Sequence, residues 1–217
     1  MHRVSEPAIL YFGTPVVLVS TLNADGSPNL APISSVFWLG WRCMIGVAAS
    51  SKTSENLARE RECVLNLPSS DMTDAVNRLA LTTGSNPVPD AKLSRGYRHC
   101  ADKFGEGGLS PERSIVVGAP RVAECPVQLE AVFEASHQLA ERDRPGGPMC
   151  FELRVVRVHL DDSIVMTDAP DRVDPDRWRP LIMSFQKFYG LGPQLTPSIL
   201  ARVPEGMYQT PDIELAR

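Results

Sequence analysis

Several stretches of the chain carry apolar side chains in the pattern of β-strands. Residues 127–135 alternate Val, Leu, Ala, Phe and Ala with mostly polar side chains, among them Gln128 and Glu130. Such alternation is typical of an antiparallel strand with one face on the core and the other in solvent. Shorter apolar runs predict further strands over residues 16–21, 29–41, 43–50 and 63–67.

Two of the predicted strands are irregular. Residues 151–160 alternate as far as Val155 and resume at Val156, and this one-residue slip predicts a β-bulge. Pro32 interrupts the predicted strand over 29–41. Because proline has no backbone N–H for the ladder, this position requires a strand edge or a bulge.

Helical patterns are fewer. A short polar helix is expected over residues 54–62, and a helical segment is expected over 175–192. Another helix has its apolar side chains at the i, i+3, i+4, i+7 spacing of one face, at Met72, Ala75, Val76 and Leu79. Residues 82–114 are rich in Gly, Pro and polar side chains and are long for a passive connection, which predicts a functional lid or a mobile segment.

Many short strands, few helices and no strand–helix–strand rhythm predict a mainly β fold. We expect a closed antiparallel barrel with helical additions, in a single domain over residues 1–217. A Rossmann dinucleotide domain is disfavoured, because no G-x-G-x-x-G follows a predicted strand and "FGEGG" at 104–108 has the wrong spacing.

Composition narrows the classes of function. The chain has 22 Lys and Arg against 26 Asp and Glu, a net charge of −4, with no basic cluster, so we expect no nucleic-acid partner. The five cysteines form no C-x-x-C pair and the four histidines lack metal-ligand spacing, so we expect no metal site. The N-terminus has no signal-peptide pattern, and no apolar run reaches membrane-spanning length. We therefore expect a cytoplasmic protein without a membrane partner.

The strand over 43–50 leads into "SSKTSEN", a stretch with several anion-binding groups. These groups belong to Ser50, Ser51, Lys52, Thr53 and Asn56. In one interpretation they cap the helix, with Thr53 as the cap and Asn56 as a weaker capping-box partner. In the other, the hydroxyls, the ammonium and the first helical N–H groups bind a phosphate monoester.

A second unusual stretch is "NLAPISSVF" at residues 29–37. Pro32 frees backbone groups from the ladder, and Ser34 and Ser35 are small. A planar heterocycle could lie there, bonded by main-chain N–H and C=O groups. The alternative interpretation is a kinked edge strand without a ligand.

Together these residues resemble the flavin reductase-like family. The resemblance extends from Tyr11 to Gly192 and rests on the N-x-A-P-x-S and K-T-x-x-N patterns, in this order, with "DAVNRLA", "PRVAECPVQLEA" and "RVDPDRWRPL". It implies an antiparallel FMN-binding split β-barrel of the Greek-key type, with peripheral helices and the long lid. It also implies a homodimer with FMN between the subunits.

The resemblance also assigns roles to individual residues by their positions in the motifs. The isoalloxazine ring of FMN would be lined by Ala31, Pro32, Ile33, Ser34 and Ser35. The ribityl phosphate would be held by Ser50, Ser51, Lys52, Thr53 and Asn56. The "DKF" at 102–104 resembles a family segment near the open face of the flavin.

One position departs from the family pattern. Reductases of the family often carry an Asp-His pair close to the flavin, and alignment on "RVVRVHLDD" places that pair at Gly147 and Pro148.

The expected function is an FMN-dependent oxidoreductase that passes hydride from NADH or NADPH to free flavin or another small molecule. The departure favours an alternative, a flavoenzyme with tightly bound FMN and a specific organic substrate. A non-catalytic flavin-binding protein is a further alternative, and no catalytic residue is predicted.

Overall fold

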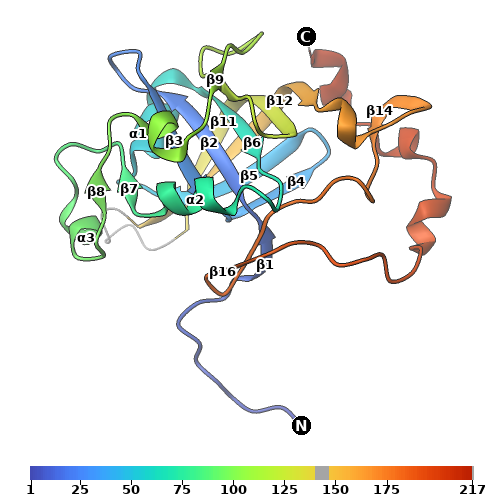
Figure 1. Ribbon diagram of the computed structural model, residues 1–217, viewed down its shortest axis with the longest axis horizontal. Helices are drawn as coiled ribbons and strands as arrows, with labels where there is room; N and C mark the ends of the chain where they lie inside the picture. Colours follow the sequence, from blue (N-terminus) through green and yellow to red (C-terminus); the bar gives the residue numbers. More distant parts are fainter. Residues whose placement is uncertain (140–146, 217) are drawn as a thin grey trace.

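The computed structural model describes residues 1–139 and 147–216, and its centre is one curved antiparallel sheet (Figure 1). Its strands are hydrogen-bonded in the order β3-β2-β6-β11-β12-β5-β4. Their bounds are β2 Val17–Leu22, β3 Pro28–Ile33, β4 Val36–Leu39, β5 Arg42–Ala48, β6 Glu62–Leu67, β11 Val127–Gln138 and β12 Pro148–Leu160. Strands β3 and β4 follow each other in the chain but stand at opposite ends of this order. The sheet therefore curls into an antiparallel split barrel.

The predicted strand over 29–41 is wrong in one respect, because the structure divides it into β3 and β4. The division falls at Ser34 and Ser35, where the Ser35 carbonyl accepts a 2.7 Å hydrogen bond from the Gly46 N–H of β5. Pro32 lies in β3 at one end of the sheet, so the requirement for an edge position is confirmed.

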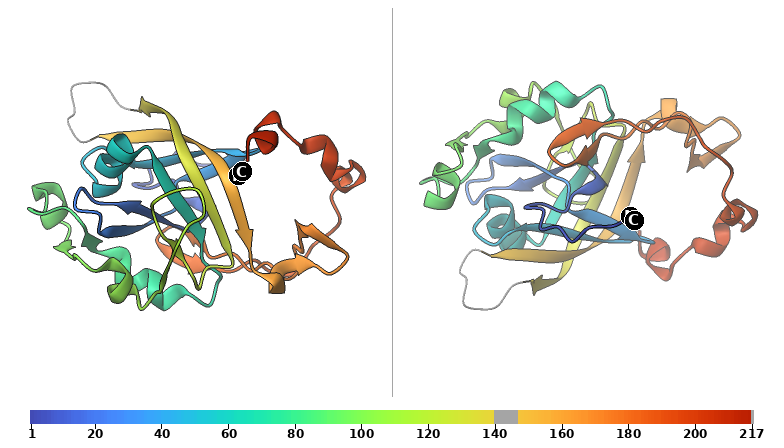
Figure 2. Two further views of the ribbon diagram at one scale, coloured as in Figure 1. Left: turned by 90° about the horizontal axis from the view of Figure 1, so that it is seen from above. Right: turned by 90° about the horizontal axis from the view of Figure 1, so that it is seen from below.

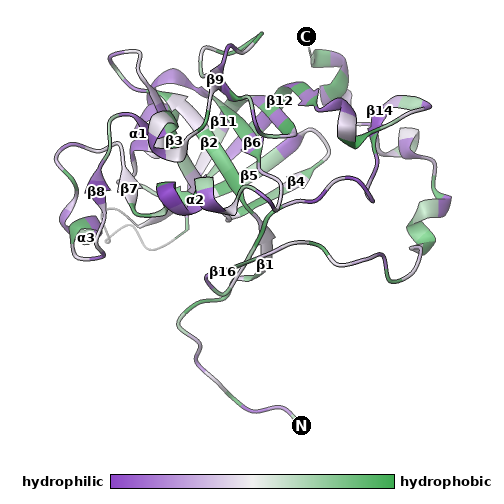
Figure 3. Ribbon diagram, in the orientation of Figure 1, coloured by the Kyte–Doolittle hydropathy of each residue, from purple (hydrophilic) through white to green (hydrophobic). Residues whose placement is uncertain are grey.

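Alternate side chains of the strands fill the barrel. Val17, Val19, Leu65 and Leu153 are fully buried in its interior. Figure 3 shows β2 as a hydrophobic strand in the middle of the molecule, whereas α2 beside it carries hydrophilic residues. Burial of these aliphatic side chains is the main favourable term that holds the sheet closed.

The β-bulge predicted between the two alternating halves of β12 is confirmed. Glu130 of β11 lies opposite Arg157, and Ala131 lies opposite Val155. Val156 therefore has no partner across the ladder, and the alternation of β12 changes face at this residue.

The strand over 127–135 is confirmed, but its polar face does not lie in solvent where the strand begins. Gln128 is 6% exposed and Glu130 is 0% exposed. Residues that follow β9 (Pro111–Glu112) and precede β10 (Arg121–Val122) fold over this face. Their backbone N–H groups bond Glu130, which a pattern of apolar positions cannot reveal.

Short helices cover the outside of the barrel. These are α1 Lys52–Glu60, α2 Thr73–Ala80, α3 Asp90–Leu93 and α4 Lys103–Gly107. The apolar face predicted for α2 is confirmed, since Ala75, Val76 and Leu79 are buried against the outer side of β2 and β3. None of the helices among the described residues is long and apolar enough to cross a membrane.

The lid segment, residues 82–114, contains elements of its own. They are β7 Thr82–Thr83, α3, β8 Arg98–His99, α4 and β9. Strands β7 and β8 pair in parallel, and Phe104 of α4 is buried together with α2. The segment is therefore packed onto the barrel at both ends.

The helical segment predicted over 175–192 is wrong. The structure has a hairpin there, of β15 Ile182–Ser184 and β16 Lys187–Tyr189, and β15 also pairs with β1 Phe12–Pro15. Phe185 and Gln186 make the turn with positive φ angles of 46° and 66°. The apolar spacing of these residues is compatible with a helix. In the structure their backbone N–H and C=O groups are instead bonded within the hairpin and to β1.

The remaining elements lie on one side of the barrel. They are η1 Asp162–Ile164, β13 Val165–Met166, β14 Ala169–Val173, η2 Ile199–Arg202, η3 Glu205–Tyr208 and η4 Pro211–Leu215. Both views of Figure 2 show the C-terminal part of the chain leaving the barrel in a wide arc and returning to it. The end of this arc, η4, is held against the barrel by Arg42 of β5, which donates hydrogen bonds to Asp212.

Candidate functional site

The helix cap lies two residues earlier than the sequence pattern predicts. Helix α1 begins at Lys52, and Ser51 is its N-cap, with the Ser51 hydroxyl accepting the Ser54 N–H at 3.1 Å. Ser51 has the extended backbone that an N-cap requires. The prediction that Thr53 is the cap is therefore wrong, because Thr53 already lies inside the first turn.

Asn56 does not reach back to the cap, so the predicted capping box is also wrong. Its side chain is 0% exposed, and its amide donates to the Thr21 hydroxyl and to Asn23 Oδ1, both at 3.0 Å. Arg59 in turn donates to Asn56 Oδ1 at 3.0 Å. Asn56 thus anchors the first turns of α1 to β2 and to the turn that follows it.

The accessible side-chain donors at the start of α1 are the Ser50 hydroxyl and the Lys52 ammonium, because the Ser51 hydroxyl donates to Ser54 Oγ at 3.0 Å. Ser50 is exposed, Ser51 and Lys52 are half-buried, and Thr53 is buried. The Lys52 ammonium pairs with Glu55 at 2.8 Å, three residues along the helix. Such an exposed pair contributes little, so the ammonium can turn to another anion at small cost. We call residues 50–53 the anion seat.

In the second predicted stretch, residues 31–33 divide between the two faces of β3, and Ser34 and Ser35 follow the strand. Ala31 and Ile33 lie opposite Val19 and Val17, whose side chains fill the barrel. Pro32 lies on the outer face. The side chains of the stretch therefore do not form one row on one face. What these residues share is backbone at the edge of the sheet.

The structure brings the two predicted stretches together through β5. The Ser35 carbonyl bonds Gly46, and β5 continues from Gly46 to Ala48, directly before the anion seat. The contact is close, since a Cβ added to Gly46 would lie 3.0 Å from the Ser35 Cβ. Only glycine allows this approach without a shift of the Ser34–Ser35 corner.

A pocket of about 190 Å³ lies beside this corner on the outer face of the barrel. Its lining is mostly apolar and consists of Val16, Pro32, Ile33, Ser34, Val76, Ala80, Met183 and Phe188. Three of these residues belong to the predicted ring stretch. Met183 and Phe188 were not predicted, because they come from the β15–β16 hairpin that the sequence pattern presented as a helix.

The lid segment also touches the anion seat. A Cβ added to Gly84 would lie 2.5 Å from Asn29 Oδ1 and 3.1 Å from Lys52 Cγ. The chain directly after β7 therefore passes against the Lys52 side chain. No pattern of residues indicates this contact, which joins residues more than thirty positions apart along the chain.

Gly147 and Pro148, the positions to which the resemblance assigns an Asp-His pair, lie beside the same seat. The Gly147 carbonyl accepts the Ala49 N–H at 2.9 Å, and Pro148 lies opposite Ala48. Ala49 directly precedes Ser50. In this chain the two positions offer no titratable side chain.

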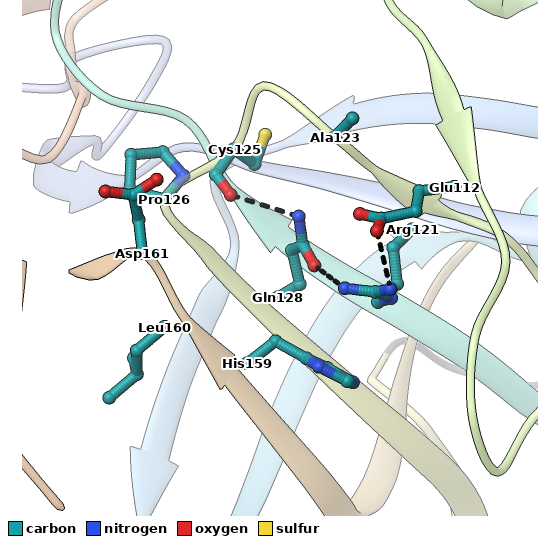
Figure 4. Close-up of a pocket in the computed structure, with 9 residues that line it drawn as sticks. All are labelled: Glu112, Arg121, Ala123, Cys125, Pro126, Gln128, His159, Leu160 and Asp161. Carbon is teal, nitrogen blue, oxygen red and sulfur yellow. Dashed lines mark hydrogen bonds and ion pairs between the residues drawn. The ribbon is translucent and has the colours of Figure 1, made fainter. Parts of the chain in front are cut away.

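A second pocket, of about 280 Å³, lies between β9, β10, the start of β11 and the end of β12 (Figure 4). Its polar groups bond one another: Arg121 donates to Gln128 at 2.6 Å and pairs with Glu112 at 3.1 Å. The Gln128 amide donates to the carbonyls of Val122 and Cys125. Because these donors are already used within the protein, we assign no ligand to this pocket.

Solved structures share this architecture. A flavoredoxin of Desulfovibrio vulgaris (Miyazaki F) matches with a TM-score of 0.74 and 20% identity over 93% of this chain and 99% of that chain. Nitrilotriacetate monooxygenase component B from Bacillus cereus matches with a TM-score of 0.69 and 20% identity over 88% of this chain and 89% of that chain. At such identities the likeness establishes a common split-barrel fold.

The sequence identifies the family. Residues 9–192 match the model of the flavin reductase like domain, so the chain belongs to the flavin reductase-like family. The uncharacterized protein YdfE of Bacillus subtilis (strain 168) is 35% identical over 188 residues, which are 86% of this chain and 88% of that protein. The resemblance inferred from the N-x-A-P-x-S and K-T-x-x-N patterns is confirmed.

Proposed function

We propose that this protein is an FMN-dependent oxidoreductase that takes hydride from NADH or NADPH and passes it to an acceptor. The observation that supports the proposal is the hydrogen bond from the Gly46 N–H to the Ser35 carbonyl, which ties the end of the ring stretch to β5, the strand that leads toward the anion seat. A mononucleotide flavin needs a flat apolar region near a separate anion site.

The donor set at the seat fits a phosphate monoester. It combines the Ser50 hydroxyl, the Lys52 ammonium and the first N–H groups of α1, a helix of nine residues. The Ser51 hydroxyl supports the seat from within, because it donates to Ser54 Oγ and accepts the Ser54 N–H. Hydroxyls, an ammonium and a helix N-terminus are all suited to an anion with several acceptor oxygens. Asn56 supports the seat indirectly in this proposal, because its amide donors are used within the protein.

The ring of FMN would lie along the free edge of β3 and the apolar pocket beside Ser34. Bound flavin would supply the redox chemistry, accepting and releasing hydride at its ring. The chain would supply orientation: backbone groups of residues 31–35 for the ring and the anion seat for the phosphate. The acceptor is free flavin or a small organic molecule, and the working unit is a homodimer.

A specific observation favours a second candidate, in which FMN stays bound and a particular organic substrate is reduced. Gly147 and Pro148 occupy the position of the family's Asp-His pair, beside the anion seat. One test separates the two candidates. The first predicts steady reduction of added FMN or FAD by NAD(P)H, and the second does not. A protein that binds FMN without any NAD(P)H oxidation would be a flavin-binding protein instead.

The first experiment is a visible absorption spectrum of the protein with FMN, before and after anaerobic NADH or NADPH. Bleaching of bound flavin is the expected result. The variant Lys52→Ala is expected to weaken FMN binding about tenfold, the effect of one charge-assisted phosphate contact. Arg172→Ala removes an exposed cation that also pairs with a glutamate, Glu205, and serves as the matched control. Equal FMN affinity in Lys52→Ala and the control would refute the phosphate seat.

A further inference from the structure

Residues 90–99 of the lid segment carry an excess of positive charge. They read "DAKLSRGYRH", with three cationic side chains against a single carboxylate, in a chain whose net charge is −4. Arg98 is paired with Glu106 at 2.6 Å. Among the residues that the structure describes, no carboxylate forms an ion pair with Lys92 or Arg95. The charges of these two residues are therefore available to an anion.

Lys92 and Arg95 are both held beside the ring of Tyr97. Gly96 turns the chain back after α3 with a positive φ of 82°, which glycine adopts readily, and the Tyr97 N–H donates to the Lys92 carbonyl at 3.1 Å. The Lys92 ammonium lies 5.6 Å from the centre of the ring, and the Arg95 guanidinium lies 5.9 Å from it. Cation–π attraction at these distances holds the three side chains together. We call Lys92, Arg95 and Tyr97 the lid patch.

Both cations of the lid patch keep donors for a ligand. The half-buried Lys92 donates to the Thr83 hydroxyl at 3.0 Å, which leaves two of its three ammonium protons. Burial, and then the nearby Arg95, lowers the pKa of Lys92, and a bound anion would oppose both effects. Arg95 is exposed, and within the described part of the chain its guanidinium makes one hydrogen bond, from Nε to the Ala91 carbonyl at 2.7 Å. Its two terminal amino groups remain for an anion.

The lid patch lies beside the anion seat. Thr83, which the Lys92 ammonium bonds, is followed directly by Gly84, where an added Cβ would lie 3.1 Å from Lys52 Cγ. The Cα atoms of consecutive residues are about 3.8 Å apart, so the two lysines contact neighbouring points of one segment. Figure 1 shows β7, β8 and α3 at the same end of the molecule as α1. A ligand bound at or next to the anion seat can therefore reach the lid patch.

We propose that the lid patch binds the adenosine phosphate part of a dinucleotide. The inference rests on the function proposed above and adds a second recognition site to it. An adenosine phosphate combines a flat ring, which stacks on a tyrosine or a guanidinium, with phosphate oxygens that accept from two cations. Two dinucleotides can bring this group to the site. One is the hydride donor, NADH or NADPH, and the other is FAD, whose adenylate continues from the phosphate that the anion seat would hold.

The test titrates the FMN-loaded protein with 2′,5′-ADP and with 5′-AMP, the adenosine ends of NADPH and NADH, and compares FMN with FAD on the apoprotein. A double variant, Lys92→Gln with Arg95→Gln, removes both charges, and glutamine at 92 keeps a donor for Thr83. We expect it to bind the adenosine phosphate about tenfold more weakly. The matched control, Lys187→Gln with Arg202→Gln, removes two exposed cations from β16 and η2 and should change nothing.

A third variant tests the stacking. Tyr97→Leu keeps an apolar side chain but removes the ring, so it is expected to weaken binding of the adenosine phosphate about tenfold. Binding of inorganic phosphate, which has no ring to stack, should stay as in wild type. Retained FMN binding in each variant, measured by the visible spectrum, shows that the barrel and the anion seat are intact.

The outcomes separate the two sources of the adenosine phosphate. Binding of 2′,5′-ADP or 5′-AMP to the FMN-loaded protein, weakened in the lid double variant, would assign the lid patch to the hydride donor. Tighter binding of FAD than of FMN in wild type, lost in the double variant, would assign it to FAD. If FMN binds and neither result is obtained, the inference is overturned and the proposed function stands. A protein that binds no FMN would instead overturn the proposed function, and this inference with it.

Discussion

The Gly46 N–H donates to the Ser35 carbonyl at 2.7 Å, and this bond joins the corner between β3 and β4 to the strand that leads into the anion seat. Two motifs that are separated in the sequence are thereby connected through β5. The relationship depends on a glycine, since a Cβ at residue 46 would lie 3.0 Å from the Ser35 Cβ.

The variant Gly46→Ala is therefore expected to displace the Ser34–Ser35 corner. Overpacking of this kind costs about 1–3 kcal/mol of unfolding free energy, and the displaced corner should weaken FMN binding about tenfold. Urea unfolding and a fluorescence titration with FMN measure the two effects. Gly206→Ala is the control, because a Cβ there meets nothing within 4 Å. Unchanged FMN affinity in Gly46→Ala would show that the corner does not shape the site.

Glu130 holds the loop between β9 and β10 on the barrel. Its carboxylate accepts the N–H groups of Ile115, Val116 and Val117 at 2.6–2.9 Å, and His159 Nε2 lies 2.7 Å away. Burial alone would raise the pKa of Glu130, but these hydrogen bonds together hold it below the ordinary value of 4.5. The carboxylate therefore stabilises the fold above pH 4.5, and this contribution is lost as the pH falls through the lower, folded-state pKa.

The variant Glu130→Gln is expected to lose about 1–3 kcal/mol of unfolding free energy at pH 7, because one amide oxygen cannot satisfy three N–H donors. Its stability should also change less than that of wild type as the pH falls below 4.5. Urea unfolding at several pH values measures both effects. Glu134→Gln, on the same strand but more exposed, is the control. Parallel pH curves for wild type and Glu130→Gln would contradict this account.

The return of the C-terminal arc rests on Arg42, which bonds both oxygens of Asp212 at 3.1 and 3.0 Å and also Glu152 at 2.9 Å. Asp212→Ala is expected to release η4 and to speed proteolytic cleavage after residue 190 several-fold, since this bidentate pair is partly shielded, with the Asp212 side chain 16% exposed. Limited proteolysis with mass spectrometry detects the cut. Glu205→Ala breaks the more exposed pair with Arg172 and should change the rate less. Equal rates in the two variants would contradict a special role for Asp212.

The sequence by itself determined the type and place of most barrel strands. Side chains that alternate every second residue can be buried only by an extended chain, so residues 127–135 and the slip at Val156 specified a strand and its bulge without further information. The order of the N-x-A-P-x-S and K-T-x-x-N patterns was enough to indicate the family. These are local properties, set by a residue and its near neighbours in the chain.

Only the tertiary structure decided which residues are buried by segments that are remote in the sequence. The apolar spacing of residues 175–192 fits a helix as well as strands, and pairing with β1 selected the hairpin. Glu130 and Lys103 look like solvent-facing residues in the sequence, but distant backbone groups surround them. The pocket beside Ser34 combines residues from Val16 to Phe188 for the same reason. Burial depends on contacts between remote segments, and local periodicity does not encode them.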